Sequence, residues 1–192
     1  MNLFIDTISN PCNLILFDNN RQIIDNDSWL IKGNESSTLI PHIDKLIKKN
    51  NLDYFGIENI VIVNWPWSFT WVRTAVLVAN SINYIIKKHI TSTNYFDLFN
   101  SYPIIKSSSK RDCFIKKSLN SEVEILSNED LLEYLKDNNV KEAYWEKLAY
   151  IEDNWGRLEI FDKIDYKGII SNIKFSSFDR VKPLYIKKPN IS

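Results

Sequence analysis

Short apolar runs separated by polar turns open the chain. Leu3–Ile5 and Asn13–Phe17 each predict a strand, and Asn10-Pro11 between them is a turn signal. A second turn at Asp18–Asn20 leads into a third predicted strand over residues 22–31. Three successive strands joined by tight turns predict an antiparallel meander.

The apolar spacing then changes to that of two helices around one buried strand. A helix capped by Ser36 or Ser37 is predicted to continue to Lys49, because its apolar residues recur at helical spacing: Leu39, Ile40, Ile43, Leu46 and Ile47. The β-branched run Ile57–Val63 predicts a strand buried on both faces. Residues 68–88 predict a long helix that is apolar on every side in its middle, so it needs a second covering, either a neighbouring helix or another protein.

The second half of the chain has a less regular pattern. We predict strands at 102–105, 112–115, 157–161, 168–175 and 184–186, a helix at 127–137, and leave 141–150 open. No internal repeat is visible. The whole pattern predicts an α/β protein with an N-terminal lobe, residues 1–97, and a shorter C-terminal lobe, residues 98–192.

Charge and composition exclude several classes of protein. The net charge is zero, and the lysines are dispersed in short pairs such as Lys87-Lys88, so composition does not indicate an electrostatic nucleic-acid binder. The sequence shows neither a membrane-spanning run nor a signal peptide. The two cysteines, Cys12 and Cys113, are far apart, and the two histidines, His42 and His89, lie outside any metal-ligand spacing. We therefore expect a cytoplasmic protein with ordinary thiols and no metal site.

Four segments carry a resemblance to a known family. They are Asp6-Thr7 at the end of the first strand, Leu39-Ile40-Pro41-His42-Ile43-Asp44-Lys45-Leu46, Trp65-Pro66-Trp67-Ser68-Phe69-Thr70-Trp71-Val72-Arg73, and Pro183-Leu184-Tyr185-Ile186-Lys187. In these segments the chain resembles the TsaB (YeaZ) family. The family shows Asp-Thr, Leu-Leu-Pro-x-Ile-Asp-x-Leu, Gly-Pro-Gly-Ser-Phe-Thr-Gly-Leu-Arg and Pro-x-Tyr-Leu-Arg there. The resemblance covers residues 1–90 and the C-terminal end, while residues 100–180 match weakly.

The motif loop departs from the family at three positions. Trp65, Trp67 and Trp71 stand where the family has Gly, in a chain with 4 Gly against 6 Trp. Two explanations stay open: a divergent member with an aromatic patch, or UGA codons that the source organism reads as Gly but that were translated as Trp. The same mistranslation could affect Trp29, Trp145 and Trp155, although no family motif covers these positions for comparison.

The resemblance implies a two-lobed actin/Hsp70/sugar-kinase-like (ASKHA) fold and a non-catalytic accessory role. TsaB-like proteins pair with a TsaD-like subunit and, with a TsaE-like ATPase, support formation of N6-threonylcarbamoyladenosine at position 37 of tRNA, which is reached through the complex. The candidate interface positions are Glu35, Leu39, Arg73, Val76, Leu77, Asn80 and Tyr84; the alternative is that they belong to the core. A homodimer is the expected state of the chain alone.

Asp6 and Thr7 are the candidate nucleotide-facing residues, because kinase-like members of the superfold hold a hydrated magnesium ion at the position of Asp6. They are followed by Ile8-Ser9-Asn10-Pro11, which contains no Gly to bring backbone N–H groups to phosphates. We therefore expect no independent cofactor, with ATP present only in the complex, and no catalytic residue. A small ATP-dependent kinase or ATPase of the same superfold is the alternative function.

Overall fold

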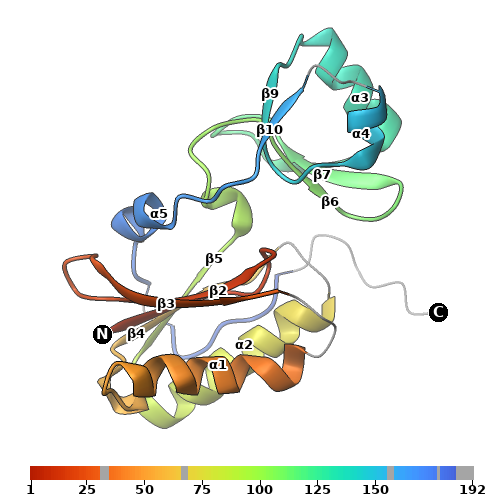
Figure 1. The fold of residues 1–192 in the computed structure, drawn as a ribbon. Helices are drawn as coiled ribbons and strands as arrows, with labels where there is room; N and C mark the ends of the chain where they lie inside the picture. The colour runs from red at the N-terminus through yellow and green to blue at the C-terminus, as the bar shows by residue number, and fades with distance from the viewer. Residues whose placement is uncertain (31–34, 66–68, 155–157, 177, 185–192) are drawn as a thin grey trace. The chain divides into compact units, whose positions relative to one another are not determined.

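The computed structural model describes residues 1–30, 35–65, 69–154, 158–176 and 178–184; the side chains of Glu35, Ser36 and residues 69–71 lie outside the description. The chain forms two compact units (Figure 1). The first contains Met1–Tyr95 and the segment that begins at Lys167, and the second is Phe96–Tyr166. The expected lobes, 1–97 and 98–192, differ from these units in the C-terminal segment, because Phe178 forms a β-bridge with Ile90 of the first unit.

A five-stranded mixed sheet organises the first unit. Its strands are β1 (Asn2–Asp6), β2 (Cys12–Phe17), β3 (Ile23–Trp29), β4 (Asn59–Val63) and β5 (His89–Thr93), in the order β3-β2-β1-β4-β5. β1, β2 and β3 pair antiparallel, whereas β4 and β5 continue the sheet in parallel with β1. The predicted meander and buried strand are confirmed. β5 was not predicted, because its half-polar residues follow the long helix without a turn signal.

Two helices cover the first sheet and pack against each other: α1 (Glu35–Lys49) and α2 (Phe69–Ile86). α1 buries Leu39, Ile43, Leu46 and Ile47, as its apolar spacing predicts. The predicted long helix is confirmed from Phe69, while its expected start at Ser68 lies outside the described residues. It ends at Ile86, because Lys87 takes a left-handed φ of 51°.

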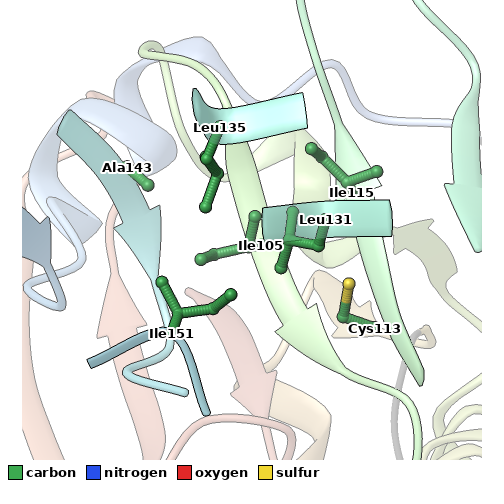
Figure 2. Packing of buried hydrophobic residues seen from close by; sticks show 7 residues of the cluster. All are labelled: Ile105, Cys113, Ile115, Leu131, Leu135, Ala143 and Ile151. Atoms are coloured by element: carbon green, nitrogen blue, oxygen red, sulfur yellow. The ribbon is translucent and has the colours of Figure 1, made fainter. Parts of the chain in front are cut away.

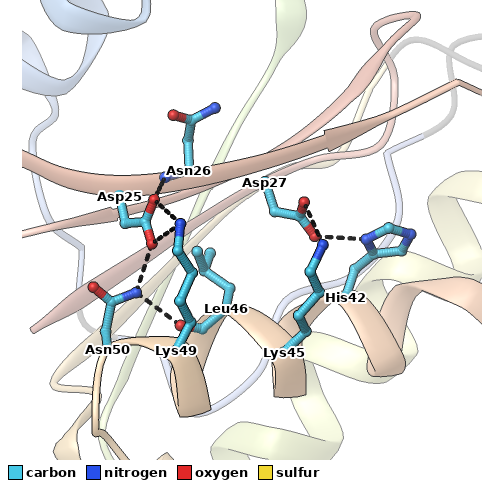
Figure 3. Close-up of polar contacts among 8 residues, drawn as sticks. All are labelled: Asp25, Asn26, Asp27, His42, Lys45, Leu46, Lys49 and Asn50. Carbon is cyan, nitrogen blue, oxygen red and sulfur yellow. Dashed lines mark hydrogen bonds and ion pairs between the residues drawn. The ribbon is translucent and has the colours of Figure 1, made fainter.

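Two carboxylates of β3 hold α1 against this edge strand (Figure 3). Asp25 pairs with the Lys49 ammonium at 2.8 Å, and Asp27 pairs with Nδ1 of His42 at 2.6 Å. Hydrogen bonds from Lys49 and Asn50 lower the pKa of Asp25. Burial alone would raise the pKa of Asp27, but the hydrogen bonds from His42 and Lys45 outweigh it and leave that pKa lowered.

The second unit contains a second five-stranded mixed sheet. Its strands are β6 (Ile104–Ser107), β7 (Asp112–Lys116), β8 (Val123–Ser127), β9 (Glu142–Trp145) and β10 (Glu159–Phe161), in the order β10-β9-β6-β7-β8. Helices α3 (Asn128–Asp137) and α4 (Ala149–Asn154) close over it. Figure 2 shows their shared core, formed by Ile105, Cys113, Ile115, Leu131, Leu135, Ala143 and Ile151.

Several expectations for the second half need correction. The strand predicted at 168–175 is wrong: α5 (Tyr166–Asn172) lies there, because Ile169-Ile170 is too short an apolar run to decide the period and only Ile170 is buried. The open segment 141–150 contains β9 and the start of α4, and β8 was missed. In the strand predicted at 184–186, Leu184 is not in a strand and the other residues lie outside the description.

The two sheets share one topology. In each, a three-strand meander (β1-β2-β3 or β6-β7-β8) is extended by two parallel strands beside its first strand (β4-β5 or β9-β10). The helices repeat as well, since α1 and α3 follow the meanders, and α2 and α4 link the parallel pairs. The expected α/β class with a mixed sheet is confirmed, and the duplication is visible only in the structure.

Candidate functional site

An apolar groove lies between α1, α2 and the short 3-10 helix η1 (Tyr54–Gly56) of the first unit. It has a volume of about 400 Å³. Its buried lining residues include Val78 and Ile82, and Ile40, Phe55, Leu77 and Ile85 are exposed at its rim. Phe55 is 64% exposed and Leu77 66%. Large apolar side chains gathered on one face typically mark a surface that another molecule covers. We call these six residues and the adjacent Tyr84 the helix-pair face.

The expected interface positions separate into two groups. Leu77 and Tyr84, which is 82% exposed, belong to the helix-pair face, and Arg73 is also exposed. Leu39 and Val76 are buried within the unit, so their side chains offer no surface to a partner. The side chain of Glu35 lies outside the described residues.

Asn80 has a different role from the expected one. Its side-chain amide donates to the carbonyl of Val181 at 2.9 Å, and its carbonyl accepts from the Val181 N–H at 2.9 Å. Asn83 and Asn64 likewise donate to the carbonyls of Asp179 and Lys182. These asparagines therefore hold the chain's own C-terminal strap, which we define as residues 173–176 and 178–184.

Sequence reasoning missed Phe55, Ile40 and Ile85 as surface residues. Phe55 lies in η1, shortly after α1, and from the sequence alone an aromatic side chain there would be assigned to the core. Its one available signal is the neighbouring Asp53, which accepts from the Gly56 N–H and so caps η1, holding Phe55 in a defined turn. Ile40 and Ile85 each lie beside the row of buried residues on their own helix. The 3.6-residue period separates exposed from buried positions only when the element that packs against the helix is known.

Only part of the motif loop can be placed. Trp65 is buried, and its carbonyl accepts from the Tyr95 N–H at 2.6 Å. It is not among the described residues with a left-handed φ, so the backbone at this position does not itself require Gly. The rest of the loop lies outside the description: Pro66, Trp67 and Ser68, and the side chains of Phe69, Thr70 and Trp71. The explanation that UGA codons read as Gly were translated as Trp therefore stays a prediction.

The strand end at Asp6 forms a closed hydrogen-bond cluster. Oδ1 of Asp6 accepts from the N–H groups of Ile8 at 2.8 Å and Ser9 at 3.0 Å, and Oδ2 accepts from the Ser9 hydroxyl. That hydroxyl also lies 2.8 Å from the phenol oxygen of Tyr95. Asp6 and Thr7 are buried. Both carboxylate oxygens of Asp6 therefore already accept hydrogen bonds from the chain's own groups, three in all.

In the described ranges, no group of three or more His, Cys, Asp or Glu side chains could hold a metal ion. None of the described helices has the length and apolar character needed to cross a bilayer.

Two such sheets with flanking helices form the same fold as solved YeaZ-like structures. YeaZ from Pseudomonas aeruginosa superimposes with a TM-score of 0.63 over 85% of this chain and 86% of that one, at 14% identity. A crystal structure of an uncharacterized protein with similarity to peptidase YeaZ from Pseudomonas aeruginosa gives 0.72 over 97% and 100%, at 13% identity. The resemblance to YeaZ (TsaB) indicated by the motifs is thus confirmed in the fold.

Sequence comparisons add one relative. The uncharacterized protein MG208 of Mycoplasma genitalium is 23% identical over 200 residues, which cover 97% of this chain and 95% of that protein. No family model matches the chain.

Proposed function

We propose that the chain is a non-catalytic partner of a TsaD-like threonylcarbamoyltransferase in the formation of N6-threonylcarbamoyladenosine at position 37 of tRNA. The observation that carries the proposal is the helix-pair face on a YeaZ-like fold. Its exposed residues Ile40, Phe55, Leu77, Tyr84 and Ile85 would be costly to leave in water, and a protein partner would cover them. A TsaE-like ATPase and tRNA join through this complex, and the proposed location is the cytoplasm.

The proposal includes no cofactor for the chain alone, with ATP bound only in the complex. The hydrogen-bond cluster at Asp6 supports this part, because Ile8 and Ser9 already donate three hydrogen bonds to its two carboxylate oxygens. Titration calorimetry of the chain with ATP and magnesium is expected to give no heat of binding. A one-to-one isotherm would instead favour a small kinase or ATPase of the same superfold.

The partner proposal is tested with two matched Leu→Asp variants. Leu77 is 66% exposed on the helix-pair face, and Leu119 is 70% exposed in the β7–β8 turn of the second unit. Leu77→Asp would place a carboxylate in a desolvated interface, at a cost of about 2 kcal/mol or more, which is a Kd at least ~30-fold weaker. Leu119→Asp should leave the Kd unchanged.

The measurement is co-purification and calorimetry with the source organism's TsaD homologue. Absence of a complex at micromolar concentrations would overturn the proposed function. Equal weakening by both variants would show that the helix-pair face is not the contact. The chain alone is expected to run as a homodimer in size-exclusion chromatography.

A further inference from the structure

The tertiary structure gathers cations that are dispersed in the sequence. Ile90 and Phe178 exchange two backbone hydrogen bonds, of 3.3 and 3.4 Å, and Asn83 donates to the carbonyl of Asp179 at 3.0 Å. These contacts hold the strap residue Arg180 near the turn from α2 to β5, where Lys87 and Lys88 lie. All three cations are exposed.

The strap extends this group along α2. The two hydrogen bonds between Asn80 and Val181 place the exposed Lys182 along this helix. Lys174 is not part of the group, because the Ile173 carbonyl accepts from the Arg21 guanidinium at 3.0 Å and Phe175 stacks on Phe17, both at the β2–β3 end of the sheet. We call Lys87, Lys88, Arg180 and Lys182 the basic stripe.

Few carboxylates balance the basic stripe. Asp179 is exposed within the strap. Glu58 lies close enough to Lys88 for that charge to help lower its pKa, after its larger contacts with Asn19 and the N-terminal ammonium. The ammonium lies 3.6 Å from the Glu58 carboxylate and already compensates part of its charge. In a chain of zero net charge, the stripe is therefore a local excess of positive charge.

Helix chemistry explains only part of the stripe. Cations just beyond a helix C-terminus interact favourably with its dipole, which accounts for Lys87 and Lys88. It does not account for Arg180 and Lys182, because the strap is anchored there through its main chain and the anchoring does not require basic side chains. A run of exposed cations along an extended segment instead matches the spaced charges of a phosphate backbone.

We propose that the basic stripe binds the phosphate backbone of an RNA; resting on the proposed function, this RNA is the tRNA held by the complex. The contact is electrostatic, adds affinity without reading bases, and weakens with salt. It gives the accessory chain a direct part in holding the tRNA.

The test compares two triple variants that remove the same charge. Lys87→Gln/Lys88→Gln/Arg180→Gln neutralises the stripe, and Lys141→Gln/Lys147→Gln/Lys163→Gln neutralises three exposed lysines of the second unit. Binding of a labelled, unmodified tRNA transcript is measured by fluorescence anisotropy at several salt concentrations. The full chain is used alone and together with the TsaD homologue.

We expect the stripe variant to bind tRNA at least tenfold more weakly at low salt. The magnitude of the slope of log K against log salt should also fall by about 2 to 3, as expected for three lost phosphate contacts. The control variant should bind within threefold of the wild type. Equal loss in both variants, or no loss in either, would overturn the proposal. Unchanged tRNA binding with weaker TsaD binding would assign the stripe to a protein contact and would also overturn it.

The two proposals can fail separately. If no complex forms with the TsaD homologue, the proposed function fails, while tRNA binding by the chain alone still tests the stripe. If the complex forms and the stripe variant binds tRNA like the wild type, only the stripe proposal fails.

Discussion

Replacing Asn80 tests how the C-terminal strap is held on α2. Asn80→Ala removes two hydrogen bonds of 2.9 Å to the main chain of Val181, whose side chain is buried. A net contribution of about 0.5–1.5 kcal/mol for each bond gives a loss of about 1–3 kcal/mol. The upper end applies where water cannot reach the freed Val181 groups. Because a loss of 1.4 kcal/mol is tenfold in an equilibrium, the population with a released strap should rise about 5- to 150-fold.

Two assays separate local release from global unfolding. Urea denaturation followed by far-UV circular dichroism reports the loss of global stability. Limited trypsin digestion reports strap release, through the rate of cleavage after Arg180, provided that closing is fast compared with cleavage. The matched control is Asn172→Ala, because the exposed Asn172 makes one local bond to Gly168 of its own helix. If Asn80→Ala is no less stable than Asn172→Ala and is cleaved at the wild-type rate, the strap is not held by these bonds.

Three other outcomes are expected. The pKa of Asp27 is lowered in the folded chain, so its pair with His42 stabilises the fold above the ordinary pKa of Asp. This stabilisation is lost as the pH falls through the folded pKa, below about pH 4. Asp27→Asn should therefore lower the free energy of unfolding by about 1 kcal/mol in urea melts near pH 6 and leave it unchanged near pH 2, and a pH-independent cost would contradict this. Burial raises the pKa of Cys113 to about 12, so iodoacetamide at pH 8 should label it only in urea, and rapid labelling of the native chain would refute that burial. Trp145 has a φ of 97°, a backbone conformation that favours Gly. We therefore expect the tryptic peptide 142–147 from the source organism to have the mass calculated with Gly at position 145. The mass calculated with Trp would contradict the explanation that a UGA codon read as Gly was translated as Trp here.

The sequence alone determined the local elements of the first unit. Alternating apolar runs and turn residues specify the meander β1–β3, and the β-branched run specifies β4, because these signals act over a few neighbouring residues. The same spacing specifies α1 and α2, and the motifs specify the YeaZ-like fold. Where a signal was short, as at Ile169-Ile170, the period could not be decided and a helix was taken for a strand.

Residue exposure on α2 was decided only in part by the sequence. Val76 and Leu77 are adjacent and equally apolar, yet Val76 is buried and Leu77 is exposed at the rim of the groove. Helical periodicity separates their directions, but it does not tell which direction meets α1, the sheet or solvent. Of the candidate interface positions on this helix, Leu77 and Tyr84 are therefore exposed, whereas Val76 is buried.

Only the tertiary structure decided the features that join distant parts of the chain. Asn80 and Val181 are 101 residues apart, and no local pattern marks an asparagine that will clamp a backbone so far along the sequence. The same long-range pairing brings Arg180 to Lys87 and Lys88, so a chain with dispersed lysines carries a basic stripe. The duplicated topology is equally hidden, because hydrogen-bonded strand order depends on which segments meet in space and not on their sequence similarity.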